Sequence, residues 1–333
     1  MSKIPDASDA RSITGRARPP GRPSKLGGSG TFIASLGNHI DVDSPRGYYI
    51  DLSSKAVSSK SPPDWYVPGS RRLHVVIIQW GLGCHERYVD GDGEDWLEAA
   101  RWVADHLIEI QEDGGRHDGG WVQHFPYKHT YRLTPPWLSG MAQGEGASLL
   151  VRIHAATGED RYAEAALRAL RPMRVGTAAG GVAGNLDSAF LPEEYPTDPA
   201  SHVLNGAIFG LFGVYDVAAA LGDEGARELA DEGISTLAGA LDRYDTGYWS
   251  RYDLFPHPVT NLANPMYHGL HTDQLRAMSL IDDDPRFPAT VARFERYATS
   301  RVNRTRALAT KAVFRVLVPR NRWLAYRLPW TRG

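Results

Sequence analysis

A glycine followed by acidic residues recurs along this 333-residue chain at a nearly constant interval. Gly93-Glu-Asp, Gly158-Glu-Asp and Gly222-Asp-Glu lie 65 and then 64 residues apart, and Asp282-Asp-Asp follows at a similar interval. Glycine often ends a helix in the left-handed conformation, and acidic side chains favour the first turn of the next helix. The repeat therefore predicts helix–turn–helix units connected by long loops.

Apolar residues on both sides of these turns follow helical spacing. Between Trp96 and Ile108 they recur at intervals of three and four, as on the buried face of a helix, and strand patterns are almost absent. Repeated helix hairpins either close into an (α/α) toroid, with an inner and an outer ring, or remain an open array. The toroid is the fold that we expect, with its loops gathered at one end. Further stripes of the same kind occupy residues 149–156, 162–170, 203–219, 226–241 and 287–298.

Composition divides the chain into four parts. Residues 1–30, rich in Ser, Gly, Pro and Arg, have too few apolar residues to build a core, so we expect a disordered basic arm. Residues 31–72 predict a short irregular or β-hairpin segment packed on the barrel. Residues 73–303 then form the (α/α) barrel, and residues 304–333 a basic amphipathic tail.

The formal net charge of -2 hides an uneven distribution. Residues 1–30 carry six Lys or Arg and two Asp, and residues 301–333 carry nine Lys or Arg and no acid. This leaves 22 basic and 37 acidic residues in 31–300, a net of -15. An acidic body is unlike the basic face of a nucleic-acid-binding protein, so nucleic acid is not an expected partner. An acidic ligand would have to be held by a few placed basic groups.

Signals for secretion or membrane insertion are weak. Cys84 is the single cysteine, which excludes an internal disulfide, and the N-terminus lacks the apolar core of a secretory signal. The most apolar run, Leu73–Ile78, is too short to cross a bilayer. We expect a cytoplasmic protein. Its basic tail predicts either peripheral contact with an anionic membrane or a helix packed on the barrel, and a homodimer is a further candidate assembly.

The loops between the predicted helices are rich in aromatic, Gly, His and Asn residues, as in segments 119–127, 191–197 and 247–271. Such loops on a rigid scaffold commonly carry binding sites. Trp and Tyr have flat apolar faces on which a sugar ring can stack, so the loops predict a carbohydrate cleft. The competing interpretation is that these side chains only fill gaps between helix ends.

Seven motifs of these loops and helices resemble one known family when they are taken in order. The family is the D-glucuronyl C5-epimerases of heparan sulfate and heparosan modification, and the resemblance is to their C-terminal catalytic domain, from about Gly119 to Leu280. The motifs are Met141-Ala-Gln-Gly-Glu-Gly-Ala-Ser-Leu-Leu-Val-Arg, Glu193-Glu-Tyr-Pro-Thr, Val203-Leu-Asn-Gly, Tyr215-Asp, Trp249-Ser-Arg-Tyr-Asp-Leu, Asn261-Leu-Ala and Tyr267-His-x-x-His-x-x-Gln-Leu.

The resemblance implies an (α/α) barrel that inverts C5 of D-glucuronate in a polysaccharide to give L-iduronate, without a cofactor. By motif match, Tyr195, Tyr252 and Tyr267 fall on the catalytic tyrosines, and Glu194 on the acidic residue beside the first. The chemistry agrees, because inversion at a carbon α to a carboxylate needs a base on one face and an acid on the other. Tyrosine, with a pKa near ~10, serves as either once its phenolate is stabilised.

The substrate carboxylate must also be neutralised, so that the enolate-like transition state is stabilised more than the ground state. Arg251, His268 and His271 are the candidates for that role. His268 and His271 also have metal-ligand character, but no third ligand of suitable spacing accompanies them, so we expect no metal. The hydrogen-bonding candidates are Asn205 and Gln143, and Trp121 is the candidate for stacking on the sugar.

One position departs from the family pattern. Phe255 follows Tyr252-Asp-Leu where the resemblance leads us to expect a basic residue, which leaves the identity of the acidic polymer open. A polysaccharide lyase is one alternative, because it removes the same C5 proton and then expels the C4 substituent. A glycoside hydrolase with Glu194 and Asp253 as its carboxylate pair is another, and a glycan-binding protein without activity is a third.

Overall fold

A computed structural model describes residues 35–59, 66, 73–128 and 130–319 of the chain. Over these residues the protein is mainly helical, as the sequence predicts, and carries two small antiparallel β-hairpins. The predicted arm 1–30 and the part of the tail after Pro319 lie outside the described residues.

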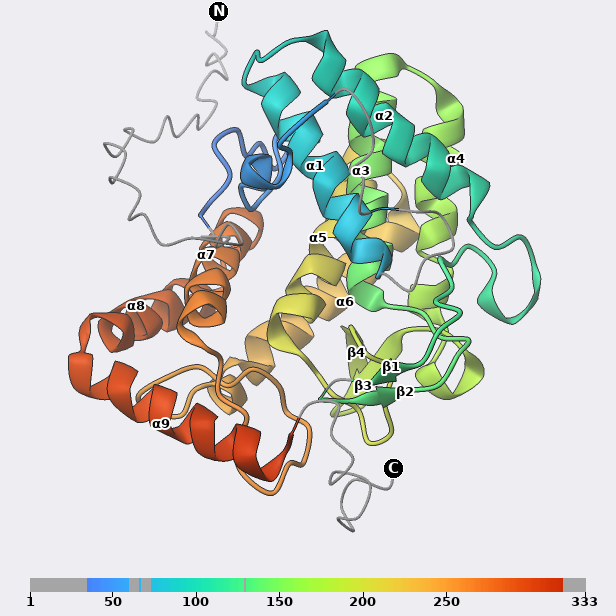
Figure 1. Cartoon of the computed structure of the whole chain (residues 1–333). Coiled ribbons are helices and arrows are strands. Elements are labelled where there is room, and N and C mark those ends of the chain that lie inside the picture. Colours follow the sequence, from blue (N-terminus) through green and yellow to red (C-terminus); the bar gives the residue numbers. More distant parts are fainter. Residues whose placement is uncertain (1–34, 60–65, 67–72, 129, 320–333) are drawn as a thin grey trace, which may run out of the picture. The chain divides into compact units, whose positions relative to one another are not determined.

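Eight helices of the described part form four hairpins that follow one another in the sequence, and α9 (Arg301–Leu317) packs on α8 (Figure 1). Short 3-10 helices occupy Ser53–Lys55, Gly115–His117, Pro172–Arg174, Thr177–Ala179 and Leu241–Tyr244. The hairpins are α1 (His74–Val89) with α2 (Glu94–Glu109), α3 (Gly140–Thr157) with α4 (Asp160–Ala169), α5 (Leu204–Leu221) with α6 (Glu224–Ala240), and α7 (Pro265–Ile281) with α8 (Arg286–Thr299).

The turns within the hairpins use the glycines of the sequence repeat. Gly158 and Gly222 end α3 and α5 in the left-handed conformation, with φ of 73° and 65°, and Gly93 precedes α2 with φ of 122°. Asp223 then caps α6, because its side chain accepts a hydrogen bond from the Ala226 N–H at 2.7 Å. The repeat in the sequence is therefore a repeat of helix hairpins.

The first helices of the hairpins pack in sequence order, α1 against α3, α3 against α5, and α5 against α7. The backbones of α3 and α5 lie so close that a Cβ on Gly213 would be 2.0 Å from the Gly144 carbonyl oxygen. This order is that of the inner ring of a toroid. Closure of the row into a complete ring remains a prediction.

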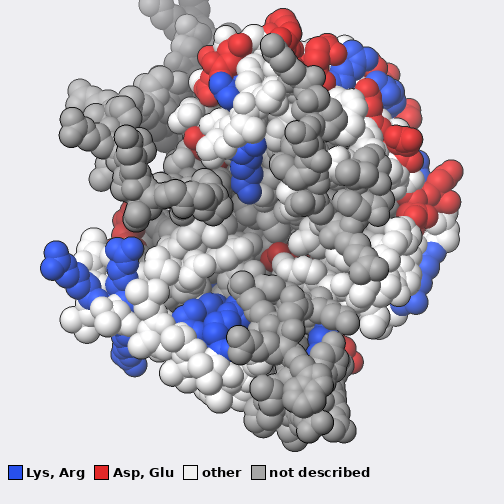
Figure 2. Space-filling view, in the orientation of Figure 1, with Lys and Arg blue, Asp and Glu red and all other residues white. Residues whose placement is uncertain are grey.

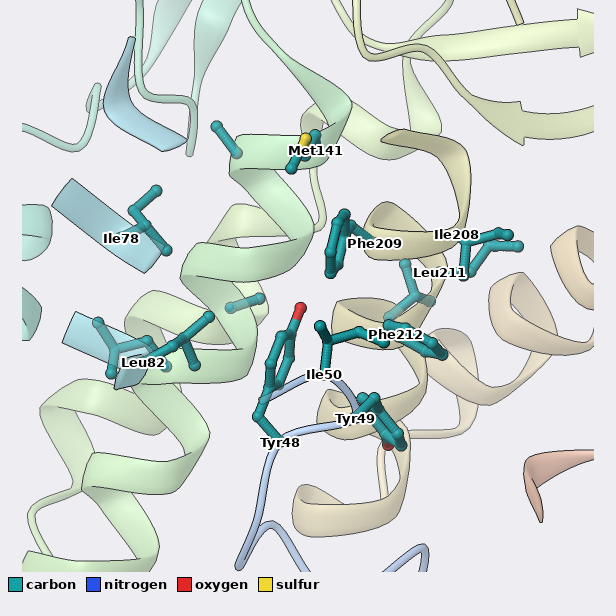
Figure 3. Close-up of a cluster of buried hydrophobic side chains, with 14 of the residues drawn as sticks. Tyr48, Tyr49, Ile50, Ile78, Leu82, Met141, Ile208, Phe209, Leu211 and Phe212 are labelled. Carbon is teal, nitrogen blue, oxygen red and sulfur yellow. The ribbon is translucent and has the colours of Figure 1, made fainter. Parts of the chain in front are cut away.

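The segment before α1 contributes aromatic side chains to the core next to α5 (Figure 3). The Tyr49 ring stacks on Phe212 with 4.2 Å between centroids, and its hydroxyl donates to Asp216 at 2.8 Å. Asp216 also forms a buried ion pair with Arg152 of α3 at 2.6 Å, and Arg152 donates to the Gly47 carbonyl oxygen at 2.7 Å. Removing one charge of this pair would leave the other buried and unpaired, at a cost of about 3–5 kcal/mol.

Two β-hairpins lie in the loops between the helix pairs. β1 (Tyr127–Lys128) pairs with β2 (Arg132–Leu133), and β3 (Ala183–Leu186) pairs with β4 (Ala189–Pro192). The residues that join β3 to β4, Asp187 and Ser188, both have positive φ, as a two-residue hairpin turn requires. Strands of two to four residues are too short to give an alternating pattern, which explains why the sequence does not predict them.

The helix α5 corrects one expectation from the sequence. By length and composition it could span a membrane, with a mean hydropathy of 1.5 over 18 residues, whereas the sequence analysis expects the most apolar run at Leu73–Ile78. Inside the protein 78% of this window is buried, and α5 packs against α3, α6 and α7. It is therefore the central core helix of the described part.

Candidate active site

Strand β4 leads directly into two adjacent glutamates with different surroundings. Glu193 is fully buried and accepts hydrogen bonds from the Ser201 hydroxyl at 2.6 Å and the His202 N–H at 3.1 Å. The His202 Nδ1 atom also lies 2.6 Å from this carboxylate. These contacts hold the loop after Tyr195, so Glu193 is the structural member of the pair.

Glu194 faces the first turn of α5. It lies so close to Gly206 that a Cβ at that position would come within 2.4 Å of its Oε2 atom, which accepts no hydrogen bond from the described residues. Burial, with a further contribution from the Glu193 charge, raises the pKa of Glu194 to about 7. A carboxyl group with this pKa exchanges its proton near neutral pH, as an acid or base catalyst must.

Tyr195 lies in the middle of an aromatic cluster. Its ring stacks on Tyr127 with 5.2 Å between centroids, and lies 5.0 Å from Tyr131 and 6.4 Å from Trp137. The hydroxyl groups of Tyr195 and Tyr127 are 3.4 Å apart. Burial, followed by the charge of Glu194, raises the pKa of Tyr195 well above its ordinary value. Tyr195 is therefore a neutral phenol at rest and can donate a proton.

Tyr252 and Tyr267 form a second aromatic pair, edge to face, with 5.0 Å between centroids. The Tyr252 N–H donates to the Asn261 carbonyl oxygen at 2.7 Å, and its carbonyl oxygen accepts from the Leu204 N–H at 3.1 Å, which ties it to the start of α5. Burial raises the pKa of Tyr252 well above its ordinary value, and the charge of Glu194 is the next largest cause. The charge of Glu194 thus acts on both Tyr195 and Tyr252, so the carboxyl group lies close to both tyrosines.

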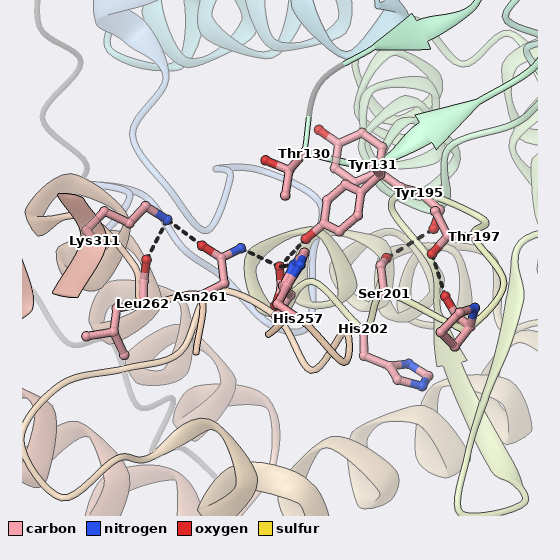
Figure 4. Close-up of polar contacts among 12 residues, drawn as sticks. Thr130, Tyr131, Tyr195, Thr197, Ser201, His202, His257, Asn261, Leu262 and Lys311 are labelled. Carbon is pink, nitrogen blue, oxygen red and sulfur yellow. Dashed lines mark hydrogen bonds and ion pairs between the residues drawn. The ribbon is translucent and has the colours of Figure 1, made fainter. Parts of the chain in front are cut away.

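A polar network that begins at Lys311 of α9 and passes through Asn261 lies next to Tyr252 (Figure 4). The Lys311 Nζ atom lies 5.4 Å from the centre of the Tyr252 ring and donates to the Asn261 side-chain oxygen and the Leu262 carbonyl oxygen, each at 2.6 Å. The Asn261 amide nitrogen donates in turn to Asp253 Oδ2. The helix α9 therefore places a positive charge beside one of the three candidate tyrosines.

The two predicted histidines of α7 share one serine. The Ser250 N–H donates to His268 Nδ1 at 3.2 Å, so His268 carries its proton on Nε2, which donates to the Phe294 carbonyl oxygen at 3.0 Å. The Ser250 hydroxyl also lies 3.0 Å from His271 Nδ1, whereas His271 Nε2 is buried without a hydrogen-bond partner in the described part. Burial lowers the pKa of His268 to about 4 and that of His271 further below its ordinary value, so both are neutral. The described residues contain no group of three metal-ligating side chains.

Asn205 and Arg251 differ in how well they fit a substrate contact. Asn205 lies in the first turn of α5, next to Gly206, and its buried Oδ1 atom has no hydrogen-bond partner among the described residues. Its carbonyl oxygen accepts from Gln274 Nε2 of α7 at 3.0 Å. Arg251 is partly exposed and donates to the Arg243 carbonyl oxygen at 3.3 Å, a contact that holds its own loop.

Trp121 and Gln143, both predicted to contact the sugar, are engaged within the protein. Trp121 is fully buried and its indole N–H donates to the Leu107 carbonyl oxygen at 2.8 Å, so neither ring face is open to a sugar. The Gln143 side chain accepts from the Trp121 N–H at 3.0 Å and donates to the carbonyl oxygens of Ala169 and Gly119 at 2.9 and 3.2 Å. These contacts favour a structural role, and neither residue is part of the site proposed below.

A groove of about 650 Å³ adjoins the aromatic cluster. Its walls include Tyr131 and Trp137, whose rings contact Tyr195, and also the basic residues Arg116 and Arg132. Neither the three candidate tyrosines nor Glu194 line it, so the groove lies beside the site and does not contain it. Its size and aromatic walls suit a short stretch of a sugar chain.

A family model described as D-glucuronyl C5-epimerase C-terminus matches residues 115–296. The chain belongs to the D-glucuronyl C5-epimerase family. The D-glucuronyl C5-epimerase of Caenorhabditis elegans is 34% identical over an alignment of 214 residues, which covers 59% of this chain and 34% of that protein. An uncharacterized protein of Methanocaldococcus jannaschii is 29% identical over 160 residues, which are 46% of this chain and 50% of that protein. The chain thus spans about a third to a half of the length of these curated relatives.

The region shared with the epimerase family contains Glu194 and all three candidate tyrosines, whereas Lys311 lies beyond its end at residue 296. The sequence reasoning missed Lys311 and the aromatic partners of Tyr195. A signal for Lys311 was present, because Ala307, Lys311 and Phe314 are spaced by four and three residues. That spacing puts a lysine on the buried face of a helix.

Proposed function

We propose that this chain is an epimerase that inverts C5 of D-glucuronate residues in an acidic, heparosan-like polysaccharide to give L-iduronate. The observation that carries the proposal is that Glu194 lies close enough to both Tyr195 and Tyr252 for its charge to raise their pKa values, within the region matched by the family. We also propose that the four helix hairpins close into an (α/α) barrel, with the site at the end where the loops gather.

In the proposed reaction, one tyrosine first gives its phenolic proton to water. Its phenolate then removes the C5 proton, and the electron pair of the broken C–H bond moves into the carboxylate to form an enediolate. A tyrosine hydroxyl on the opposite face then donates a proton to C5, so that a new C–H bond forms with inverted configuration. The Tyr195 cluster and the Tyr252–Tyr267 pair supply the two faces. The new phenolate and phenol return to their starting state by proton exchange with water.

Two groups lower the cost of the enediolate. Glu194, whose pKa is about 7 in the free site, binds a proton more firmly next to an anionic substrate and donates it in a hydrogen bond to the substrate carboxylate. Lys311 supplies the positive charge, through its place beside the Tyr252 ring, that stabilises the phenolate and the enediolate. Asn205 lies in the first turn of α5, and its side-chain oxygen, which has no hydrogen-bond partner among the described residues, can accept a hydrogen bond from a sugar hydroxyl.

The alternative reactions have less support. A hydrolase would need a second carboxylate that is open to the substrate, but Asp253 is buried, and its Oδ2 accepts from Asn261 and the Tyr131 hydroxyl and lies 3.2 Å from His257 Nε2. A lyase shares every step up to the enediolate and differs only in the loss of the C4 substituent. Product analysis therefore separates the two.

The test is to incubate the protein with heparosan and with other hexuronate polymers and to examine the products by NMR. L-iduronate in intact chains is the expected result. Unsaturated chain ends would identify a lyase, and new reducing ends without unsaturation a hydrolase. No change in any hexuronate polymer would contradict the enzymatic proposal.

A further inference from the structure

The outer face of α9 is apolar and exposed. Val302 and Val316 are 76% and 78% exposed, and Val313 is 53% exposed. Together with Ala309 these residues recur at helical spacing and form one stripe on the side opposite Ala307 and Phe314, which are buried. The inner face thus anchors α9 on the protein, and the outer face presents four aliphatic side chains to the surroundings.

Positive charges border this stripe on both sides. By helical spacing Arg301 flanks it on one side and Arg306, whose guanidinium also stacks on the Tyr248 ring at 3.8 Å, flanks it on the other, and α9 contains no acidic residue. Lys and Arg atoms gather at the lower left of Figure 2, where Figure 1 places α8 and α9, and Asp and Glu atoms gather at the upper right, around α2. An aliphatic stripe flanked by arginines on a helix without acidic residues is typical of a helix that lies in the headgroup region of a bilayer.

We propose that α9 docks the protein onto an anionic membrane surface, with Val302, Val313 and Val316 inserted between the headgroups and the flanking arginines on lipid phosphates. Charge complementarity favours lipid over a second copy of the chain. Two α9 helices packed face to face would bring arginine against arginine, whereas an anionic bilayer neutralises them. The remaining body, with its net charge of -15 over residues 31–300, is repelled by the same bilayer, so contact is confined to this face.

The test is co-sedimentation of the full chain with vesicles of phosphatidylcholine, alone or mixed with phosphatidylglycerol. Wild-type protein should bind only the mixed vesicles and be released by high salt. The double variant Val302→Asp/Val316→Asp should lose about tenfold or more of this binding, because it adds two anionic carboxylates to the inserted face. Val57→Asp is the matched control, since Val57 is 82% exposed but lies before α1, and it should bind like wild type.

Thermal unfolding and epimerase activity on a soluble polymer should be the same for all three proteins, because none of these valines contacts the site. The proposal is overturned if wild-type protein does not bind the anionic vesicles, or if the double variant binds as well as wild type. It is also overturned if the double substitution instead converts a dimer into a monomer in the absence of lipid, which would identify α9 as a subunit interface.

Discussion

At the scale of single residues, we propose that Lys311 supplies the positive charge that is missing at Phe255. The family resemblance leads us to expect a basic side chain directly after Tyr252-Asp-Leu, and the chain has Phe255 there. Lys311 belongs to α9, more than fifty residues further along the chain, and its Nζ atom donates to Asn261 and lies 5.4 Å from the centre of the Tyr252 ring. In the proposed mechanism the required charge therefore comes from a different element of the fold.

Substitution of Lys311 tests this role. Lys311→Met should lower kcat about 10²- to 10³-fold with a smaller change in KM, because the charge acts mainly on the transition state. Lys311→Arg should recover part of the loss. Arg304→Met, which removes an exposed cation from the same helix, is the control and should leave kcat unchanged. The assignment is wrong if Lys311→Met keeps its kcat while thermal unfolding shows an intact fold.

The proton on Glu194 gives a prediction about pH. If the protonated carboxyl donates to the substrate, kcat/KM falls as pH rises through about 7, where Glu194 loses its proton. Glu194→Gln keeps a donor and should flatten this decrease, whereas Glu194→Ala should lose activity at every pH. A value of kcat/KM that rises through pH 7 in the wild type would instead make Glu194 a base.

Which site residues could be found from the sequence depended on whether a local motif carried them. Glu194, Tyr195 and Tyr252 occur in short ordered motifs, and the structure brings them together. In the sequence Trp121 and Gln143 are equally good candidates for contacting the sugar, because residue type does not show where a side chain points. Their backbone contacts became visible only with the fold.

At the scale of elements, the close approach of α3 and α5 depends on glycines without a Cβ atom. Gly213→Ala would place a methyl group 2.0 Å from the Gly144 carbonyl oxygen, a backbone atom that cannot rotate away. We expect the free energy of unfolding to fall by about 1–3 kcal/mol or more, measured by urea denaturation. Gly239→Ala in α6 is the control, because the nearest atom to its Cβ is 3.6 Å away and alanine favours a helix by up to about 1 kcal/mol. Equal effects of the two substitutions would contradict this packing.

Most helices were predictable because capping residues and apolar spacing agree. The boundary of the tail was less accurate: the sequence places it at residue 304, whereas α9 begins at Arg301, directly after its N-cap Ser300. Closure of the hairpins into a barrel was not predictable in the same way. It depends on contacts between the first and last hairpins, which no local pattern encodes.

At the scale of the whole molecule, buried ionisable groups set the pH range of stability. Burial raises the pKa of Glu86 and Glu194 to about 7 and that of Glu145 to about 8, so folding favours their protonated forms. Burial lowers the pKa of His85 to about 3 and that of His268 to about 4, so folding favours their neutral forms. Between about pH 4.5 and 6.5 the glutamates make the free energy of unfolding fall with rising pH, and the histidines make it rise, so the two effects oppose each other.

Stability should therefore be greatest in that window and fall on both sides of it. Above about pH 6.5 the unfolded glutamates have lost their protons while the folded ones still hold theirs, so stability decreases up to about pH 8. Below about pH 4.5 the unfolded histidines bind protons that the folded ones resist, so stability decreases again. Urea denaturation across this pH range measures the curve, and Glu145→Gln should reduce the alkaline decrease. A stability that rises steadily from pH 5 to 8 would contradict the burial of these carboxyls.

The central claim is that the tyrosines around Glu194 remove the C5 proton of a polymer-bound hexuronate and return one from water. Incubation of the polymer in D2O, followed by NMR, measures this most directly. Wild-type protein should place deuterium at C5 in chains of unchanged length, and Tyr195→Phe should abolish most of the exchange while the fold and polymer binding persist. Absence of deuterium from C5 of every hexuronate polymer, or full exchange by Tyr195→Phe, would contradict the account.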